Sequence, residues 1–252
     1  MRSRWPPPRD RVRRDVVLRL AVRTFSEVCL TAGTLIVLFV AYVLLWTGVK
    51  ADRAADGEMA RLRDRWAAQA PPTAPPALSP PAPPAGPAAA PEEPRHAPGR
   101  AFAEMYVPRF GPDWVRPVLE GTDAELLKKG LGHYASTARL GAVGNFSVAG
   151  HRRTYGDPFK DFPELRPGDE VILKGAGTWY TYTIRGGPLR TLPTDVGVVD
   201  PVPLKSPFTA PGRYLTLTTC DPEWGHSHRL VVWAELTGTR AAGQGGPGGS
   251  SR

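Results

Sequence analysis

The chain has 252 residues, 29 of them proline and 27 glycine, and a formal net charge of +8. This length allows one or two domains, and the proline and glycine content excludes a chain that is packed throughout. The charge is concentrated at the start, where residues 1–23 carry eight arginines and two aspartates. Such a basic arm can bind nucleic acid, but the segment that follows it favours another role.

An uncharged apolar segment occupies residues 28–49, "VCLTAGTLIVLFVAYVLLWTGV". A helix of this length spans roughly 30 Å, the thickness of the hydrocarbon core of a bilayer. Tyr42 and Trp46 lie near its outer end, where amphipathic rings favour the membrane interface. No small-residue cleavage site stands out after it, which favours a retained anchor over a removed signal peptide. We therefore predict a basic cytoplasmic tail at 1–27 and a transmembrane helix at 28–49.

The arginine excess before the span predicts its orientation, because positively charged flanks stay in the cytoplasm. We expect a single-pass protein of the cell membrane, with its N-terminus cytoplasmic and residues 50–252 outside the cell. The tail would be a topology signal that also touches anionic lipid headgroups. Cys29 then lies in the membrane and Cys220 outside, so the two cannot form a disulfide within one chain. An unpaired exported cysteine indicates an intermolecular bridge or a reactive thiol.

The exported part divides by composition into four segments. Residues 50–69 are rich in Ala, Arg, Asp and Glu and predict a polar helical stem. Residues 70–100 form a Pro/Ala-rich linker with twelve prolines between Pro71 and Pro98. A chain of this kind is extended and semi-rigid, at about 3 Å per residue, and we expect it to be a spacer. A globular domain is predicted at 101–238 and a disordered tail at 239–252.

The globular domain is predicted to be mainly β. Short β-branched or aromatic runs separated by Gly, Pro and Asp predict strands at 145–151, 170–175, 178–184, 196–202, 213–220 and 229–236. A hairpin is expected to turn at Gly175–Gly177. Thr122 could cap a short helix over 123–129, with Gly130 as its stop. Many short strands with few helices indicate a closed barrel or a sandwich.

Cys220 closes the predicted strand 213–220. Strand alternation sends Leu215 and Leu217 to one face and Cys220 to the other, which argues against a buried, inert thiol. The attacking species of a cysteine is its thiolate, which a nearby His or Arg favours. Arg229 starts the next strand, so it can approach Cys220 if the two strands are neighbours. The domain's histidines, any of which could assist, are His133, His151, His226 and His228.

Three separated elements resemble the sortases, the cysteine transpeptidases of bacteria: "TLTTC" at 216–220, "NFSVAGHR" at 145–152 and Arg229 in "HRLVVWAEL". The stretch "GLGHYASTARLGAVGNFSVAGHR" is similar to the class E branch of actinobacteria. The resemblance covers residues 105–236 and implies an eight-stranded sortase-type β-barrel with short helices. It also implies that Cys220 is the nucleophile, His151 the general acid and Arg229 the oxyanion-stabilising group.

The implied reaction cleaves a Thr–Gly bond in the C-terminal sorting signal of secreted proteins, LAxTG or LPxTG-like, through a thioacyl enzyme. The acyl group then passes to an amine of a peptidoglycan precursor. Thr218 and Thr219 flank the site in the family's pattern and are candidate substrate-binding residues. Tyr134 is a third candidate, with a packed aromatic beside a turn as its alternative. No cofactor, no metal and no nucleic-acid partner are expected.

Other interpretations remain open on the residues alone. Cys220, His226 and His228 have ligand types that suit zinc, but a fourth ligand is not evident. Adjacent acids at Asp169 and Glu170 face opposite sides of a strand, which disfavours a calcium site. A non-enzymatic wall-binding or scaffold domain explains the anchor and the spacer equally well, but not the unpaired thiol, His151 and Arg229 together. A sortase-like fold without chemistry is a third alternative, although all three catalytic residue types are present. Asp221 is a departure, because a carboxylate beside Cys220 would raise the thiol pKa unless its side chain points away or pairs with Arg229.

Overall fold

The computed structural model describes residues 8–69 and 96–242. It divides into two compact units, residues 1–46 and 47–252. The first helix, α1 (Pro8–Gln69), runs through the boundary between them. In the first unit its described side chains are exposed and largely apolar, and it is the one helix of the described residues that is long and apolar enough to cross a membrane.

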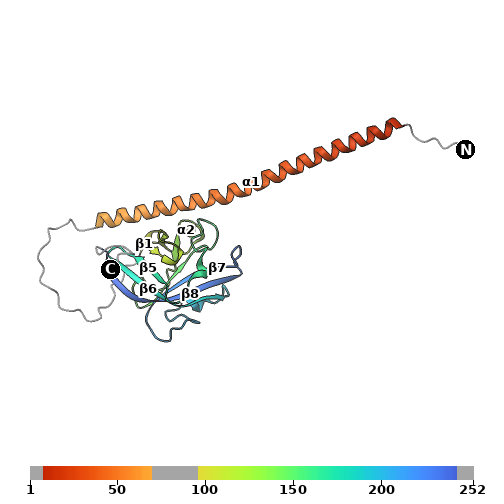
Figure 1. Ribbon diagram of the computed structural model, residues 1–252. Coiled ribbons are helices and arrows are strands. Elements are labelled where there is room, and N and C mark those ends of the chain that lie inside the picture. The colour runs from red at the N-terminus through yellow and green to blue at the C-terminus, as the bar shows by residue number, and fades with distance from the viewer. Residues whose placement is uncertain (1–7, 70–95, 243–252) are drawn as a thin grey trace, which may run out of the picture. The chain divides into compact units, whose positions relative to one another are not determined.

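The second unit is a closed barrel with the strand order β1-β2-β3-β4-β7-β8-β6-β5 (Figure 1). The strands are β1 (Ala101–Tyr106), β2 (Val115–Glu120), β3 (Leu131–His133), β4 (Gly144–Ala149), β5 (Glu170–Lys174), β6 (Thr178–Thr191), β7 (Arg213–Asp221) and β8 (His228–Ala241). The short helices are α2 (Ala124–Leu127) and the 3₁₀ turns η1 (Pro108–Phe110), η2 (Phe162–Glu164) and η3 (Val196–Val199). The expected eight-stranded barrel is confirmed.

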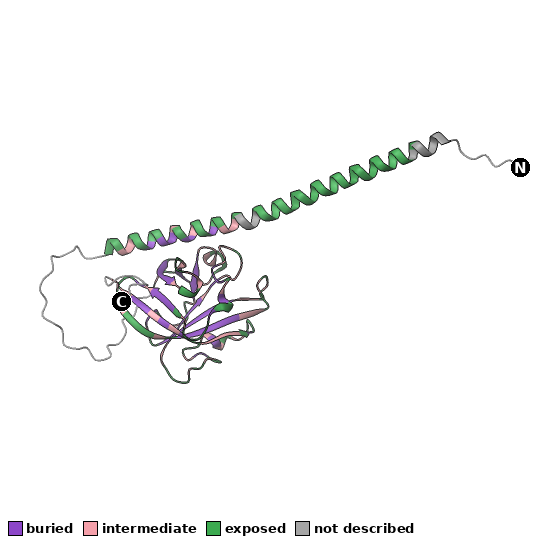
Figure 2. Ribbon diagram, viewed as in Figure 1, coloured by how far each residue is buried: buried purple, intermediate pink, exposed green. Residues whose placement is uncertain are grey.

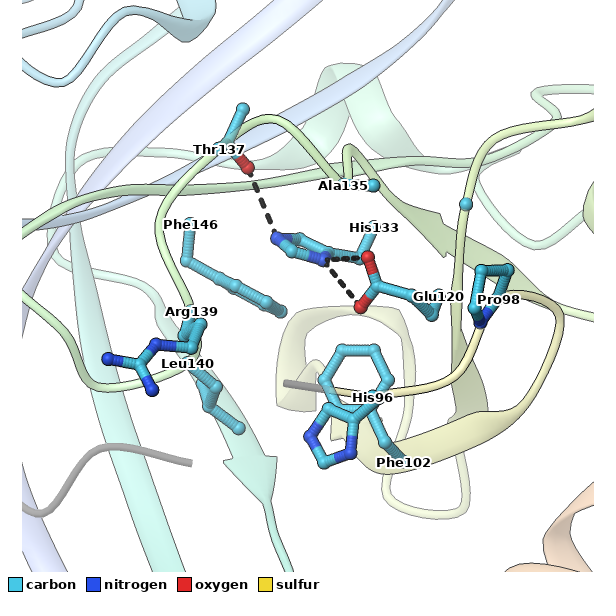
Figure 3. Close-up of a pocket in the computed structure, with 11 residues that line it drawn as sticks. His96, Pro98, Phe102, Glu120, His133, Ala135, Thr137, Arg139, Leu140 and Phe146 are labelled. Carbon is cyan, nitrogen blue, oxygen red and sulfur yellow. Dashed lines mark hydrogen bonds and ion pairs between the residues drawn. The ribbon is translucent and has the colours of Figure 1, made fainter. Parts of the chain in front are cut away.

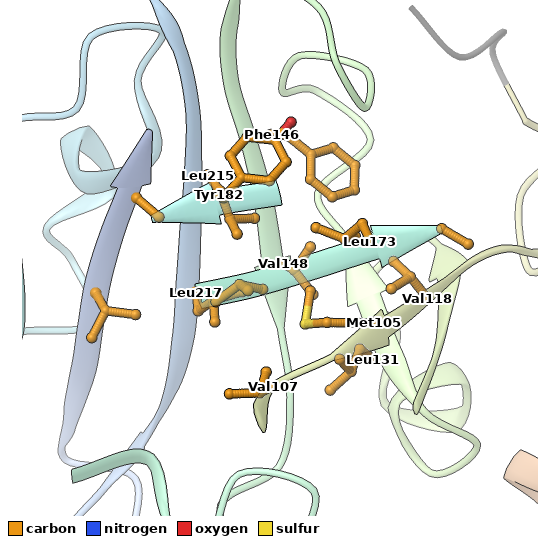
Figure 4. Close-up of a cluster of buried hydrophobic side chains, with 14 of the residues drawn as sticks. Met105, Val107, Val118, Leu131, Phe146, Val148, Leu173, Tyr182, Leu215 and Leu217 are labelled. Atoms are coloured by element: carbon orange, nitrogen blue, oxygen red, sulfur yellow. The ribbon is translucent and has the colours of Figure 1, made fainter. Parts of the chain in front are cut away.

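The barrel interior is filled by alternate residues of its strands. Phe146 and Val148 of β4 and Leu215 and Leu217 of β7 point inward and are at most 1% exposed (Figure 4). Successive strand residues face opposite sides, so the residues between them point outward. The burial of large apolar side chains on one face is what drives the sheet to close. Cys220 thus lies on the face opposite the leucines, as its position in the strand predicted.

Several expected elements need correction. Residues 196–202 are not a strand: η3 begins there, and Val198 packs on Val231 and Trp233 from outside the barrel. A short β-branched run occurs both in strands and in other buried segments, and its length does not distinguish a strand from a buried 3₁₀ turn. Helix α2 is shorter than predicted, and its N-cap is Asp123 rather than Thr122. The hairpin at 175–177 is confirmed by the pairing of Lys174 with Trp179.

The stem portion of α1 packs on the barrel. Figure 2 shows buried positions recurring along this part of the helix, and they include Ala51, Ala55, Met59 and Leu62. Their spacing of three or four residues places them on one face of a helix. Leu62 and its neighbour Trp66 pack against β1 and β2 in a small cluster of their own.

The linker residues 70–95 lie outside the described residues, but their neighbours on both sides are described. Gln69 and His96 line the same surface pocket, together with Trp66 and Ala97. The spacer that the composition of residues 70–100 predicts therefore stays a prediction. The predicted tail also lies largely outside the described residues, although β8 continues to Ala241.

A buried carboxylate fixes the stem to the barrel. Glu104 of β1 is fully buried, and Arg63 of the stem donates from Nε to its Oε1 at 2.5 Å. Tyr106 donates from its hydroxyl to the other oxygen of Glu104. Arg65 donates to the backbone carbonyl of Ala101 at 2.6 Å. A buried charge that loses its partner is strongly destabilising, so Arg63 is expected to contribute to stability as well as to docking.

Replacing Arg63 with methionine should lower the free energy of unfolding by about 1–2 kcal/mol, because it leaves the Glu104 carboxylate without its cation. The expected loss of stability is smaller than for a fully buried ion pair, because the Arg63 side chain is 55% exposed and water screens its charge. The measurement is thermal or urea unfolding of the full chain in detergent, followed by tryptophan fluorescence. Arg61→Met is the matched control, since Arg61 pairs with Glu58 within the helix and is 69% exposed. Equal unfolding midpoints for the two variants would contradict this assignment.

Candidate active site

Three strands place the predicted catalytic residues at one end of the barrel. Strands β4 and β7 are parallel, with Ala149 opposite Thr218, and the backbone N–H of Gly150 donates to the carbonyl of Thr218 at 3.1 Å. Continuing this register brings His151 to the level of Cys220. Strand β8 is antiparallel to β7 and places Arg229 directly opposite Cys220. The neighbouring strands that the sequence analysis required for Cys220 and Arg229 are therefore present.

Cys220 is a free, partly buried thiol near the end of β7. The residue before it secures the strand: the hydroxyl of Thr219 donates to the carbonyl of Gly150 at 2.8 Å, and Thr219 is only 2% exposed. This bond ties β7 to the segment that carries His151. Thr219 therefore links β7 to the segment after β4, and its part in substrate binding stays a prediction.

The His151 backbone is held by its surroundings. Its carbonyl accepts a hydrogen bond from the Phe159 N–H at 3.0 Å, and the Phe159 ring packs against Gly150. A Cβ built at Gly150 would lie 2.6 Å from that ring, so a larger residue there would displace Phe159 or His151. The glycine thus allows the close approach that positions the histidine.

The His151 ring is partly buried and adjacent to Tyr155, with 5.1 Å between the ring centroids. Its Nε2 is buried and has no hydrogen-bond partner within residues 8–69 and 96–242. Burial lowers the pKa of His151 below its usual value, and the charge of Lys128 lowers it further. A neutral imidazole with an open nitrogen can accept a proton at neutral pH, which is what a group shuttling protons from a thiol to an amine requires.

Arg229 is oriented by backbone carbonyls. Its Nη1 donates to the carbonyl of His226 at 3.0 Å and to that of His228 at 2.9 Å. A guanidinium offers five N–H donors in a planar fork, so fixing one nitrogen orients the others. This is the arrangement that a preorganised donor to a developing oxyanion needs.

A pocket of about 120 Å³ opens beside Arg229, between β7, β8 and the segment around η3. Tyr134 and Thr218 line it, and their hydroxyl oxygens lie 3.0 Å apart in a hydrogen bond. Apolar residues supply much of the remaining wall: Leu192, Pro193, Val196, Val198, Val199 and Val231. Leu192 and Val196 are 52% and 72% exposed, which is unusual for a run of large apolar side chains. The pocket thus combines an apolar wall with the Tyr134 and Thr218 hydroxyls and the Arg229 guanidinium.

Asp221 pairs with cations other than Arg229. Its Oδ1 accepts a hydrogen bond from Arg152 Nη1 at 2.5 Å, and its Oδ2 accepts one from Arg190 Nε at 2.6 Å. The sequence analysis missed both arginines. Neither arginine could be found from the residues alone, because Arg152 reaches Asp221 through the pairing of β4 with β7 and Arg190 reaches it through the pairing of β6 with β8.

A second pocket, of about 170 Å³, lies around His133 and is separate from the pocket beside Arg229 (Figure 3). His133 Nδ1 lies 3.0 Å from a carboxylate oxygen of Glu120, and its Nε2 lies 3.1 Å from the Thr137 hydroxyl. All three side chains face one another in the close-up, with His96 stacked on Phe102 beside them. The Thr137 hydroxyl also accepts a hydrogen bond from the Ser147 N–H and donates one to the Tyr134 carbonyl. These bonds stabilise the connection between β3 and β4.

The residues of the alternative zinc site have other contacts. His228 Nδ1 lies 3.1 Å from Arg190 Nη2 and 3.0 Å from the Ser227 hydroxyl. Across the described ranges 8–69 and 96–242, no group of three His, Cys, Asp or Glu side chains is arranged to hold a metal ion. Asp169, from the alternative calcium site, forms a bidentate pair with Arg109.

Comparison with known proteins bears directly on this arrangement. A family model described as a sortase domain matches residues 105–237. The curated protein sortase SrtE2 of Streptomyces coelicolor is 31% identical over 237 residues, covering 92% of this chain and 88% of that protein. Sortase SrtE1 of the same organism is 34% identical over 245 residues. That match covers 94% of this chain but 63% of the relative, so the chain spans less than two thirds of the length of SrtE1.

Solved structures agree with the sequence relatives. Sortase E from Streptomyces avermitilis is 63% identical with a TM-score of 0.58, covering 61% of this chain and 98% of that structure. Sortase E1 from Streptomyces coelicolor, solved with a tripeptide in its active site, is 38% identical with a TM-score of 0.57 over the same shares of the two chains.

Proposed function

The chain belongs to the sortase family, and we propose that it is a membrane-anchored cysteine transpeptidase whose nucleophile is Cys220. The observation that carries the proposal is the convergence of a free thiol, a partly buried histidine and an oriented arginine at the ends of β4, β7 and β8. A wall-binding or scaffold domain would have no need of this combination.

The proposed reaction begins with proton transfer from the Cys220 thiol to His151. The thiolate attacks the carbonyl carbon of a Thr–Gly bond, and Arg229 donates hydrogen bonds to the oxyanion that forms. The C–N bond then breaks, His151 delivers its proton to the departing glycine amine, and a thioester joins the threonine to Cys220. An acceptor amine attacks this thioester, forms a new amide, loses a proton to His151 and releases the thiolate, which regains that proton.

The proposed substrates are secreted proteins with a C-terminal LAxTG or LPxTG-like signal, and the proposed acceptor is an amine of a peptidoglycan precursor. The pocket beside Arg229 supports a peptide substrate, since Tyr134 and Thr218 supply hydroxyls and the segment around η3 supplies apolar contact. The tripeptide in the active site of sortase E1 from Streptomyces coelicolor supports the same kind of ligand.

The proposed location is the cell membrane, with the arginine-rich N-terminus in the cytoplasm and the barrel outside the cell. The apolar helix supports a single anchor, and the arginines that precede it support this orientation. A sorting signal displayed by a secreted protein and a precursor of the wall would both be accessible on that side.

The full chain in detergent micelles, incubated with an LAxTG peptide and an excess of a primary amine, should yield the peptide ending at Thr joined to that amine. Mass spectrometry identifies the product, and an LPxTG peptide in parallel defines the preference at the second position. A matching peptide with Thr and Gly exchanged should remain intact. Absence of cleavage in both signals, with the Cys220 thiol shown to be reduced, would refute the transpeptidase and favour a binding domain.

A further inference from the structure

An acidic residue directly after a nucleophilic cysteine is unfavourable unless its charge is balanced. A carboxylate close to a thiol disfavours the thiolate and raises its pKa. Asp221 occupies this position at the end of β7, and its side chain is 15% exposed, so water screens its charge only weakly. The contacts of Asp221 therefore bear on the reactivity of Cys220.

The carboxylate of Asp221 is shared between two arginines from different strands. Arg152, from the segment after β4, binds one oxygen, and Arg190, from the end of β6, binds the other. The Arg152 side chain is 12% exposed, so this pair is largely removed from water, whereas Arg190 is 55% exposed. Removing one partner of a largely buried ion pair leaves the other charge uncompensated. Loss of the Asp221 carboxylate should therefore disturb the position of Arg152 and of the segment that carries it.

The same contacts extend to the segments that carry the other two proposed catalytic groups. Arg152 is the residue after His151, so its bond to Asp221 joins the histidine segment to the end of β7. On the other side, Arg190 also donates from Nη2 to His228 Nδ1 at 3.1 Å. The carbonyl of His228 in turn accepts a hydrogen bond from Arg229 at 2.9 Å. Asp221, the residue after Cys220, is thus linked to the residue after His151 directly and to the residue before Arg229 through Arg190.

The charges around Asp221 sum to an excess of one positive charge: two guanidinium groups face one carboxylate. Burial by itself raises the pKa of Asp221, but the hydrogen bonds from Arg190 and Arg152 outweigh it and leave the pKa below its usual value. Because the pKa of Asp221 is lower in the folded than in the unfolded chain, its pairing with the two arginines stabilises the folded protein at pH values above the unfolded pKa of about 4. This stabilisation is lost as the pH falls through the folded pKa. Asp221 therefore remains ionised at any pH at which a thiolate is formed.

We propose that Asp221 is a positioning residue of the transpeptidase: its carboxylate, held by Arg152 and Arg190, aligns the His151 and Arg229 segments with Cys220 and offsets one of the two guanidinium charges at the end of β7. This inference rests on the proposed function of Cys220. Asp221 acts through its neighbours and takes no part in the bond-making steps.

The test substitutes asparagine for Asp221 in the full chain, in a Cys29→Ser background that leaves Cys220 as the remaining thiol. The acid limb of the kcat/KM profile should move to lower pH by about one pH unit, because two unbalanced guanidinium charges favour the thiolate and disfavour protonated His151. The value of kcat should fall between about ten- and a hundredfold through misalignment, with little change in KM. Asp221→Glu keeps the charge and should return the acid limb to its wild-type position even where kcat stays low.

The rate of alkylation of Cys220 by iodoacetamide against pH provides a readout that needs no substrate. Its midpoint should shift to lower pH in Asp221→Asn and to higher pH in Arg190→Gln, which removes one of the two cations. Glu235→Gln is the matched control, since it removes the exposed β6–β8 ion pair with Arg185 and should leave both profiles unchanged. If Asp221→Asn fails to fold, the exposed Arg190→Gln variant carries the test alone.

Unchanged pH limbs and an unchanged alkylation midpoint in a folded Asp221→Asn protein would overturn the proposal. A variant with less folded protein but an unshifted profile in the folded fraction would also overturn it, because it would assign Asp221 a structural role only. A wild-type chain that fails to turn over sorting peptides would instead refute the proposed function, and the alkylation profile would still show whether Asp221 controls the thiol.

Discussion

Alanine in place of Cys220 should abolish both cleavage of the sorting peptide and transfer to the amine, with the barrel still folded. The thiol provides the only covalent route in the proposed reaction, and the remaining groups stabilise a transition state that can no longer form. Cys220 lies near the end of β7 and outside the clusters of the core, so its truncation leaves the packing of Leu215 and Leu217 in place.

The measurement is mass spectrometry of the intact chain after incubation with the peptide alone. Without an acceptor, the wild-type protein should carry the added mass of the peptide acyl group, and Cys220→Ala should carry none. Cys29→Ala is the control, because Cys29 lies in the apolar helix and should leave the adduct unchanged. An adduct or any product from Cys220→Ala would place the nucleophile elsewhere in the chain.

Alanine in place of Arg229 should lower kcat by about a hundred- to a thousandfold, the effect found when one preorganised oxyanion donor is removed. The KM for the peptide should change little, since a group that acts on the developing charge contributes mainly in the transition state. Arg229→Lys should recover only part of the activity, because an ammonium keeps the charge but lacks the planar fork that the carbonyls of His226 and His228 orient.

Steady-state kinetics with a fluorogenic sorting peptide measures both constants for Arg229→Ala. Arg185→Ala is the matched control, because Arg185 forms an exposed ion pair with Glu235. This substitution should leave kcat within about twofold of the wild-type value. If kcat of Arg229→Ala also stays within about twofold of the wild type, Arg229 is a wall of the peptide pocket and the oxyanion has another donor.

The contribution of the fold to the site is clearest at the pairing of strands. That Cys220 and Arg229 could meet was predictable, because a short loop joins two consecutive strands and such strands are usually neighbours. The approach of His151 was predicted only through the family resemblance. Its physical basis is the parallel pairing of β4 with β7, which joins segments about seventy residues apart and leaves no local pattern in either.

Local sequence also failed where a segment departs from alternation. Strands β1 and β2 were not predicted, because Glu104 and Pro117 interrupt the apolar pattern of each. Glu104 is buried between the barrel and the stem helix, where Arg63 of the stem and Tyr106 bond its carboxylate. The pairing with Arg63 cannot be seen in the sequence of either segment alone. Residues 196–199 show the reverse error: they are apolar enough for a strand, but they form a turn that covers Trp233 from outside.

The sequence by itself determined the apolar helix, the mainly β domain, the strands around Cys220 and the family. These follow from uninterrupted hydrophobicity, period-two alternation and a few spaced motifs, all of which are local properties of the chain. Only the tertiary structure decided what surrounds those motifs: the stem packed on β1 and β2, and Asp221 between Arg152 and Arg190. These contacts depend on the order in which the strands close the barrel, and a closed sheet brings together residues that no local pattern connects.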